Sequence, residues 1–228
     1  MSTLSVGILV FPKVQQLDLT GPFEVFASVP ESDVQLVWKT TDPIRAVTGL
    51  ALTPDITYAD SPQFDVLCIP GGPGVNPLME DEETLDFIRK QAAGAKYLTS
   101  ICTGSLVLGA AGLLEGRKAT THWASHDFLA RLGAIPVKAR VVRDGNLFTG
   151  GGVTAGIDMA LTAIAEMFSQ EAAEAVQLNL EYTPEPPFDA GQPETAPEAV
   201  LETVRGRGSA SRAEREAIVE RIEGARAA

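Results

Sequence analysis

Cys102 is the residue best placed for covalent chemistry. It ends the apolar segment 97–101, and a helix-like segment begins directly after it at Gly104. A cysteine at such a strand-to-helix turn has strained backbone and lies at the carboxyl edge of a sheet, where open α/β folds bind ligands. The first N–H groups of the new helix point at the sulfur, so we expect a lowered thiol pKa. A buried structural cysteine is the alternative, but the position at the turn favours a nucleophile.

The second cysteine provides an internal comparison. Cys68 lies in the middle of the apolar run 65–69, which reads as a strand buried on both faces. We therefore interpret Cys68 as a core residue. Two cysteines are too few for a disulfide framework or a zinc cluster, and both are expected to be free thiols.

The two histidines, His122 and His126, are four residues apart. On a helix this is a metal-ligand spacing, but no third ligand lies nearby, and the preceding threonines indicate the end of a strand. We therefore expect the pair to straddle a turn and to bind no metal. Either histidine could still act through space as a base to Cys102.

Asp18 follows the first strand-like segment and is expected at the same edge of the sheet as Cys102. One interpretation is a helix N-cap, for which aspartate is a preferred residue. The other is a carboxyl group next to the thiol, where desolvation and a nearby thiolate would raise its pKa and allow it to hold or donate a proton.

Two glycine clusters also follow strand-like segments, at 71–74 and 150–152. The first lacks the G-x-G-x-x-G pattern, which argues against dinucleotide binding. Its N–H groups could line an oxyanion pocket, and both clusters could equally be turns. We expect the substrate to contact Gly72, Gly151 and Val153.

The segments that must position these residues alternate between strand-like and helix-like patterns. This alternation predicts an α/β fold, with a mostly parallel central sheet between two layers of helices. Strands are expected at 5–11, 34–38, 65–69 and 97–101, helices at 18–29, 81–93, 104–114, 157–168 and 170–182, and a hairpin at 139–148 around Asp144-Gly145.

The composition changes after Tyr182. Five prolines fall between Thr183 and Glu198, which indicates an extended arm. The segment 211–228 is highly charged and is expected to be a solvated or partner-packed helix. We therefore divide the chain into a catalytic domain, 1–182, and an arm with a C-terminal helix, 183–228, that packs on the domain or on a dimer partner.

The overall composition is that of a globular protein, with 228 residues, 45% hydrophobic and 21% charged. A formal charge of −12 argues against nucleic-acid binding, which relies on clustered basic residues. No apolar run approaches the roughly 20 residues that span a bilayer. The N-terminus lacks the pattern of a signal peptide, so we expect a cytoplasmic protein without a membrane partner.

Four motifs resemble the ThiJ/PfpI superfamily, which has the flavodoxin-like, class I glutamine-amidotransferase-like fold. They are Leu17-Asp18-Leu19-Thr20-Gly21-Pro22, Ile69-Pro70-Gly71-Gly72, Ile101-Cys102-Thr103-Gly104-Ser105 and Ala119-Thr120-Thr121-His122-Trp123. The resemblance covers almost the whole chain and implies a three-layer sandwich. It is strongest toward the branch that hydrates isocyanides, which the arm at 181–188 also resembles.

This resemblance implies a reaction and its residues. Cys102 would attack the isocyanide to form a thioimidate, Asp18 would supply a proton, and Thr103 would orient Asp18 or the thiol. Water would then release the N-substituted formamide. No cofactor or metal is implied, and members of this fold are usually homodimers.

Two departures from other branches of the superfamily support this expectation. Hydrolase-like members have histidine after the nucleophile, where this chain has Thr103, and deglycase-like members have glutamate in place of Asp18.

Three other functions are alternatives to isocyanide hydration. A glyoxalase- or deglycase-like thiol enzyme would act on reactive carbonyls. A redox sensor would oxidise an exposed Cys102. The sensory domain of an AraC-type regulator would need a helix-turn-helix module of roughly 100 residues, whereas only about 45 residues follow Tyr182.

Overall fold

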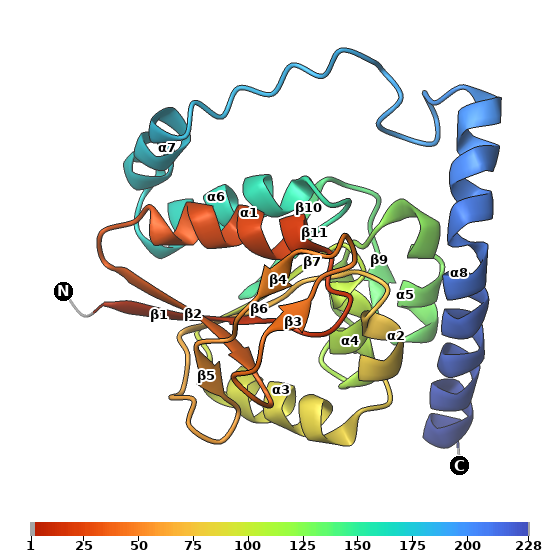
Figure 1. Ribbon diagram of the computed structural model, residues 1–228, viewed down its shortest axis with the longest axis horizontal. Coiled ribbons are helices and arrows are strands. Elements are labelled where there is room, and N and C mark those ends of the chain that lie inside the picture. Colours follow the sequence, from red (N-terminus) through yellow and green to blue (C-terminus); the bar gives the residue numbers. More distant parts are fainter. Residues whose placement is uncertain (1–2, 228) are drawn as a thin grey trace.

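A computed structural model describes residues 3–227 as a three-layer α/β sandwich (Figure 1). The central sheet has seven strands in the order β10-β11-β7-β6-β1-β2-β5, and all neighbouring strands are parallel except the pair β10–β11. Helices α1 and α6 cover one face of the sheet and α3 covers the other (Figure 1). The predicted fold class is therefore confirmed.

The strands of the central sheet are β1 (Leu4–Leu9), β2 (Ser32–Trp38), β5 (Ile56–Thr57), β6 (Val66–Ile69), β7 (Tyr97–Ile101), β10 (Val141–Asp144) and β11 (Leu147–Gly150). Two small ribbons pair β3 (Ile44–Arg45) with β4 (Ala51–Leu52) and β8 (Lys118–Ala119) with β9 (Ile135–Pro136). The helices are α1 (Gln16–Ala27), α2 (Val75–Leu78), α3 (Glu82–Gly94), α4 (Gly104–Ala110), α5 (Phe128–Arg131), α6 (Ala155–Met167), α7 (Gln170–Asn179) and α8 (Glu198–Ala227), with a 3₁₀ turn, η1 (Trp123–Ser125).

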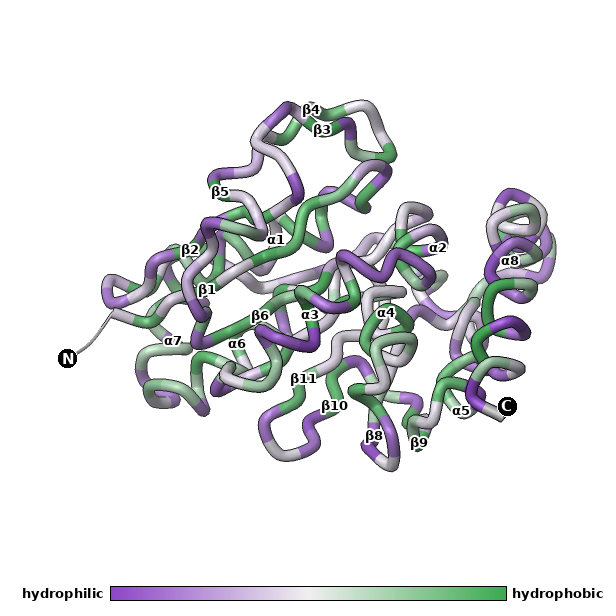
Figure 2. The backbone as a smooth tube through the Cα atoms, turned by 90° about the horizontal axis from the view of Figure 1, so that it is seen from below, coloured by the Kyte–Doolittle hydropathy of each residue, from purple (hydrophilic) through white to green (hydrophobic). Residues whose placement is uncertain are grey.

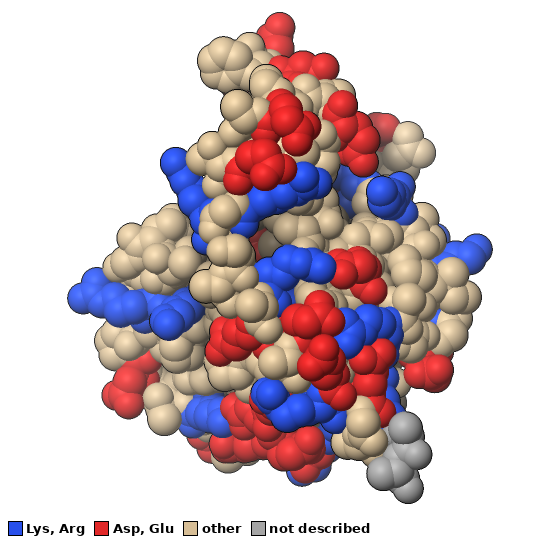
Figure 3. Space-filling model, turned by 90° about the vertical axis from the view of Figure 1, so that its right-hand side faces the viewer, with Lys and Arg blue, Asp and Glu red and all other residues tan. Residues whose placement is uncertain are grey.

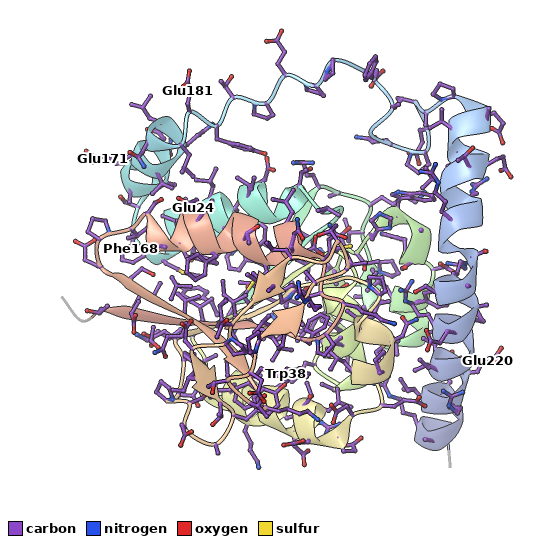
Figure 4. The ribbon with its side chains drawn as sticks, viewed as in Figure 1. Glu24, Trp38, Phe168, Glu171, Glu181 and Glu220 are labelled. Carbon is purple, nitrogen blue, oxygen red and sulfur yellow. The ribbon has the colours of Figure 1, made fainter. Side chains whose placement is uncertain are left out.

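The inner strands are apolar because helices cover both of their faces. All four residues of β6 are buried, including Cys68, which confirms the prediction of a core cysteine. Figure 2 shows hydrophobic stretches along β1 and β6 in the middle of the molecule and hydrophilic residues at its periphery, notably on α8. An aromatic group that includes Trp38, labelled in Figure 4, extends the core toward α3, where Tyr58 stacks on Phe87 with ring centroids 4.1 Å apart.

Several predicted element boundaries differ from the structure, and two of the differences have a clear local cause. The helix expected at 104–114 ends at Ala110, because Gly112 adopts a φ of +80° that terminates the helix. The hairpin turns at Gly145-Asn146 rather than at Asp144-Gly145, since Asp144 is still paired with Leu147. Gly145 has a φ of +59°, as a two-residue hairpin turn requires.

The C-terminal helix differs most from the sequence expectation. Helix α8 spans 30 residues and starts at Glu198 rather than at residue 211. Its buried side chains Ile218 and Val219 face the domain, where α8 packs on α2 and α5. Glu220 lies on the outer side of this helix (Figure 4). Within residues 3–227, no helix has the length and apolar character needed to cross a membrane.

Candidate active site

Cys102 sits on the strained turn between β7 and α4. Its φ is 54°, a left-handed value that is unusual for a residue with a side chain. The Cys102 N–H donates to the carbonyl of Gly150 at 3.0 Å, and its carbonyl accepts from the Thr121 hydroxyl at 2.7 Å. These bonds hold the turn on both sides. A Cβ on Gly104 would lie 2.0 Å from the carbonyl oxygen of Ile69, so only glycine fits where α4 begins.

Asp18 lies in the first turns of α1 and is completely buried. Its Oδ2 accepts a hydrogen bond from the Gly71 N–H at 3.0 Å, whereas Oδ1 is buried and has no hydrogen-bond partner among residues 3–227. The residue that precedes the helix is Gln15, so the N-cap interpretation of Asp18 is wrong. Burial raises the pKa of Asp18 to about 7, although the Gly71 N–H and the Cys102 thiol both act to lower it. The predicted rise is therefore confirmed as an effect of desolvation, whereas Cys102 acts in the opposite direction to the one predicted.

The thiol and the carboxyl behave as a coupled pair. Burial raises the pKa of the Cys102 thiol well above its usual value, the charge of Asp18 raises it further, and the N–H of Thr103 opposes both effects. The sequence predicted that the N–H groups at the start of α4 lower the pKa of the thiol. This prediction is wrong while Asp18 is ionised, because desolvation outweighs the few N–H groups of a seven-residue helix. Two anions side by side are unfavourable, so a thiolate at Cys102 requires the proton to reside on Asp18.

The glycine loop after β6 holds Asp18 and Thr103 together. The Gly72 N–H donates to Thr103 Oγ1 at 3.0 Å, as the Gly71 N–H does to Asp18. These N–H groups therefore bind protein side chains rather than lining an open oxyanion pocket. A Cβ on Gly71 would lie 2.6 Å from the Thr103 nitrogen and 2.8 Å from Asp18 Oδ2, so a side chain there would displace both residues.

A cavity of about 770 Å³ opens beside Cys102. Thr103, Gly72 and Val153 also line it, as the sequence predicted for the site. Gly151 instead lines a neighbouring cavity of about 680 Å³, to which Val153 also contributes. Asp18 lies behind the cavity wall in contact with the thiol.

Several residues of this cavity were not among the predicted site residues. His122, Trp123 and Ser125 come from the η1 turn, and Arg212 and Arg215 come from α8. Figure 3 views the α8 side of the molecule and shows a recess bordered by basic side chains. Helical spacing could have indicated that Arg215 points toward the domain. Arg215 precedes the apolar residues Ile218 and Val219 by three and four positions, so it lies on the same face of the helix.

The histidines do not form a dyad with the thiol in the described part of the chain. His122 Nδ1 accepts from the Ala124 N–H at 3.3 Å, and η1 separates His122 from His126, which confirms the predicted turn. Burial lowers the pKa of His122, and the nearby charge of Arg215 lowers it further. Among residues 3–227, no three histidine, cysteine or acidic side chains are arranged to hold a metal ion.

Together, the α/β sandwich and a cysteine on its strained turn, paired with a buried carboxyl, define a thiol-dependent class of α/β protein. The DJ-1/PfpI family model matches residues 4–166, and the chain belongs to this family. It is 63% identical to an isonitrile hydratase from Pseudomonas putida, over 96% of both chains.

Solved structures agree with this assignment. A ThiJ/PfpI family protein from Pseudomonas syringae is 44% identical and superposes with a TM-score of 0.93, covering 96% of this chain and 91% of that one. Drosophila melanogaster DJ-1beta, at 24% identity and a TM-score of 0.71, shares the fold over 81% of this chain and its own full length.

Proposed function

We propose that this protein hydrates isocyanides to N-substituted formamides, with Cys102 as the nucleophile. The observation that carries the proposal is the pairing of Cys102 with a buried Asp18 whose pKa is about 7, at the wall of one cavity. The near full-length similarity to an isonitrile hydratase supports the same reaction. The deglycase-like, redox-sensor and regulator-like alternatives are not favoured.

The first half of the reaction consumes the nucleophile and the proton of the pair. The terminal carbon of an isocyanide accepts the thiolate electron pair, which forms the C–S bond. The same carbon takes the proton from Asp18, which gives a thioimidate, R–N=CH–S–Cys102. A single proton shared by the pair therefore provides thiolate and acid together.

The second half restores the pair. Water adds to the thioimidate carbon, and one proton of that water returns to the Asp18 carboxylate, which lies behind the cavity wall in contact with the thiol. The nitrogen takes the other proton of the water, from the new hydroxyl group, and the C–S bond breaks as the C=O bond forms. The formamide leaves, and Cys102 and Asp18 again share one proton. In this scheme Thr103, fixed by the Gly72 N–H, positions the sulfur and the carboxyl relative to each other.

We also propose that the protein is a cytoplasmic homodimer whose chain has two parts. Residues 1–182 form the catalytic domain, and the arm and helix of 183–228 complete it. Leu178 on α7 and Phe188 on the arm are 81% and 79% exposed, and a second copy in a homodimer would cover such apolar side chains. Two free cysteines suit the reducing cytoplasm.

The test is formamide production from an alkyl isocyanide by the wild type and by Cys102→Ala and Asp18→Asn. Both variants are expected to lose activity, while Cys68→Ala, which changes the core cysteine, retains it. A parallel assay with methylglyoxal separates this activity from a glyoxalase-like one. Absence of formamide above background with the wild type would overturn the proposal, and full activity of Cys102→Ala would overturn the nucleophile assignment.

A further inference from the structure

Helix α8 places a buried guanidinium in the wall of the cavity that Cys102 lines. Arg215 is 6% exposed, and each of its three nitrogens has a neutral acceptor. Nε donates to Asn76 Oδ1 at 3.1 Å, Nη1 to Ser125 Oγ at 2.9 Å and Nη2 to Ser211 Oγ at 3.4 Å. The side chain is therefore fixed by polar residues from three different elements.

Arg215 differs from Arg212 and Arg221 of the same helix in its charge balance. Arg212 pairs with Asp127 at 2.7 Å and Arg221 pairs with Glu80 at 2.7 Å. Within residues 3–227, no carboxylate lies within 4.0 Å of the Arg215 guanidinium. A buried cation without a counter-ion is costly, which makes such a site favourable for an anion.

The group that provides this anion lies in the same cavity. Arg215 and Cys102 line the same cavity. Burial lowers the pKa of Arg215, and negative charge at Cys102 opposes this lowering, as Glu214 and Asp127 do. Glu214 itself turns to the Asn76 amide, 2.6 Å away. The positive charge of Arg215 is thus available to the sulfur.

We propose that Arg215 stabilises the Cys102 thiolate, so that α8 supplies a part of the active site that the sheet and its other helices lack. This role rests on the proposed function of Cys102 as a nucleophile. Arg215 is a positioning residue that acts through its positive charge on the sulfur. This charge favours the protonation state in which Cys102 is a thiolate and Asp18 holds the proton. Helix α8 lies beyond residue 166, where the match to the family model ends.

Other charged and titratable groups lie around Cys102 and Arg215, and they determine which variants are informative. They are Asp18 from α1, His122 and Asp127 on either side of η1, and Arg205, Arg212, Glu214 and Glu216 from α8. Ser211 is the useful neighbour, because its hydroxyl contacts Arg215 without carrying charge.

The experiment measures the alkylation rate of Cys102 by iodoacetamide as a function of pH, with peptide mapping to separate Cys102 from Cys68. This readout follows the thiolate and needs no isocyanide, so it stands apart from any failure of the hydratase proposal. Arg215→Gln is expected to move the alkylation midpoint upward by at least about one pH unit, which lowers the rate below the midpoint about tenfold. Arg215→Lys keeps the charge and is expected to recover part of the shift.

A second pair of variants keeps Arg215 in place. Ser211→Asp puts a carboxylate beside the guanidinium and is expected to raise the midpoint, whereas Ser211→Asn, of matched size, leaves it near the wild-type value. Arg221→Gln, on the exposed part of the same helix, is the control for α8 itself. Equal midpoints for Ser211→Asp and Ser211→Asn, or a wild-type midpoint in folded Arg215→Gln, would overturn the proposal.

Discussion

We expect the replacement of Asp18 with asparagine to make the protein more stable at alkaline pH and to remove most of its activity. The carboxyl is fully buried, accepts one hydrogen bond from Gly71, and has a pKa raised to about 7. Because the pKa is higher in the folded state than in the unfolded chain, the folded state binds the proton more tightly. The corresponding stability is present below the ordinary value of 3.8 and is lost as the pH rises through about 7.

The size of this stability change follows from the difference between the ordinary and the raised pKa of Asp18. One pH unit corresponds to about 1.4 kcal/mol, so the rise from 3.8 to about 7 makes ionised Asp18 destabilising by about 4 kcal/mol. Asparagine removes this cost but places an amide in a buried position where Oδ1 has no partner, which costs about 1–3 kcal/mol. We therefore expect Asp18→Asn to be more stable than the wild type by about 1–3 kcal/mol at about pH 8, and less stable by about the amide cost at about pH 4.

The assay is urea unfolding of both proteins at a series of pH values. Asp33→Asn, which changes an exposed carboxyl on β2, is the matched control. Formamide production by Asp18→Asn is expected to fall by at least about a hundredfold, the usual contribution of a positioned acid. A stability difference between Asp18→Asn and the wild type that stays constant from about pH 4 to about pH 8 would refute the reasoning about the buried carboxyl.

Three further predictions concern the surroundings of the pair, each checked by urea unfolding and by formamide production. Gly71→Ala, whose Cβ would lie 2.6 Å from the Thr103 nitrogen, is expected to lower kcat at least about tenfold, whereas Gly152→Ala, with open space at its Cβ, stays active. Thr103→Val is expected to lose about 1–3 kcal/mol, because the buried Gly72 N–H loses its acceptor, and Thr103→Ser keeps it. Cys68→Ala is expected to keep full activity while losing about 1 kcal/mol of stability, since it leaves a small void in the fully buried β6. Retained activity in Gly71→Ala, retained stability in Thr103→Val, or lost activity in Cys68→Ala would each contradict the role assigned here.

The inner strands of the central sheet could be predicted from the sequence because they are short apolar runs that helices cover on both faces. Strand β7 was predicted with its observed bounds, 97–101, and α3 to within one residue at each end. The two-residue strands β3, β4, β5, β8 and β9 have no periodicity to detect and form only through tertiary packing.

Helix α8 was underestimated for a local reason. It contains Gly206 and Gly208, and interior glycines cost a helix about 1 kcal/mol each. The sequence therefore favoured a later start, at residue 211. The observed helix begins directly after Pro197, whose carbonyl accepts from the N–H groups of Val200 and Leu201.

The candidate site also has residues that the sequence could place and one that it could not. Cys102 and Asp18 could be placed together because each follows a parallel strand, and such strands end at one edge of the sheet. Arg215 could not, since it meets Asn76 across 139 positions of sequence and lies in a segment whose charges indicated a solvated helix. The packing of α8 on α2 and α5 turns one of those charges inward.

The burial of Asp18 follows from the need for an acid without histidine. A carboxyl exposed to water is ionised at neutral pH and has no proton to give, so it can act as an acid beside a thiolate only if its pKa is raised. Complete burial does this, but it also raises the thiol pKa. A positive charge that interacts with the sulfur lowers the pKa of the thiol, while the burial that raises the pKa of Asp18 is kept. Arg215 in the cavity wall provides that charge, which is why the reactivity of Cys102 should depend on a helix far from it in sequence.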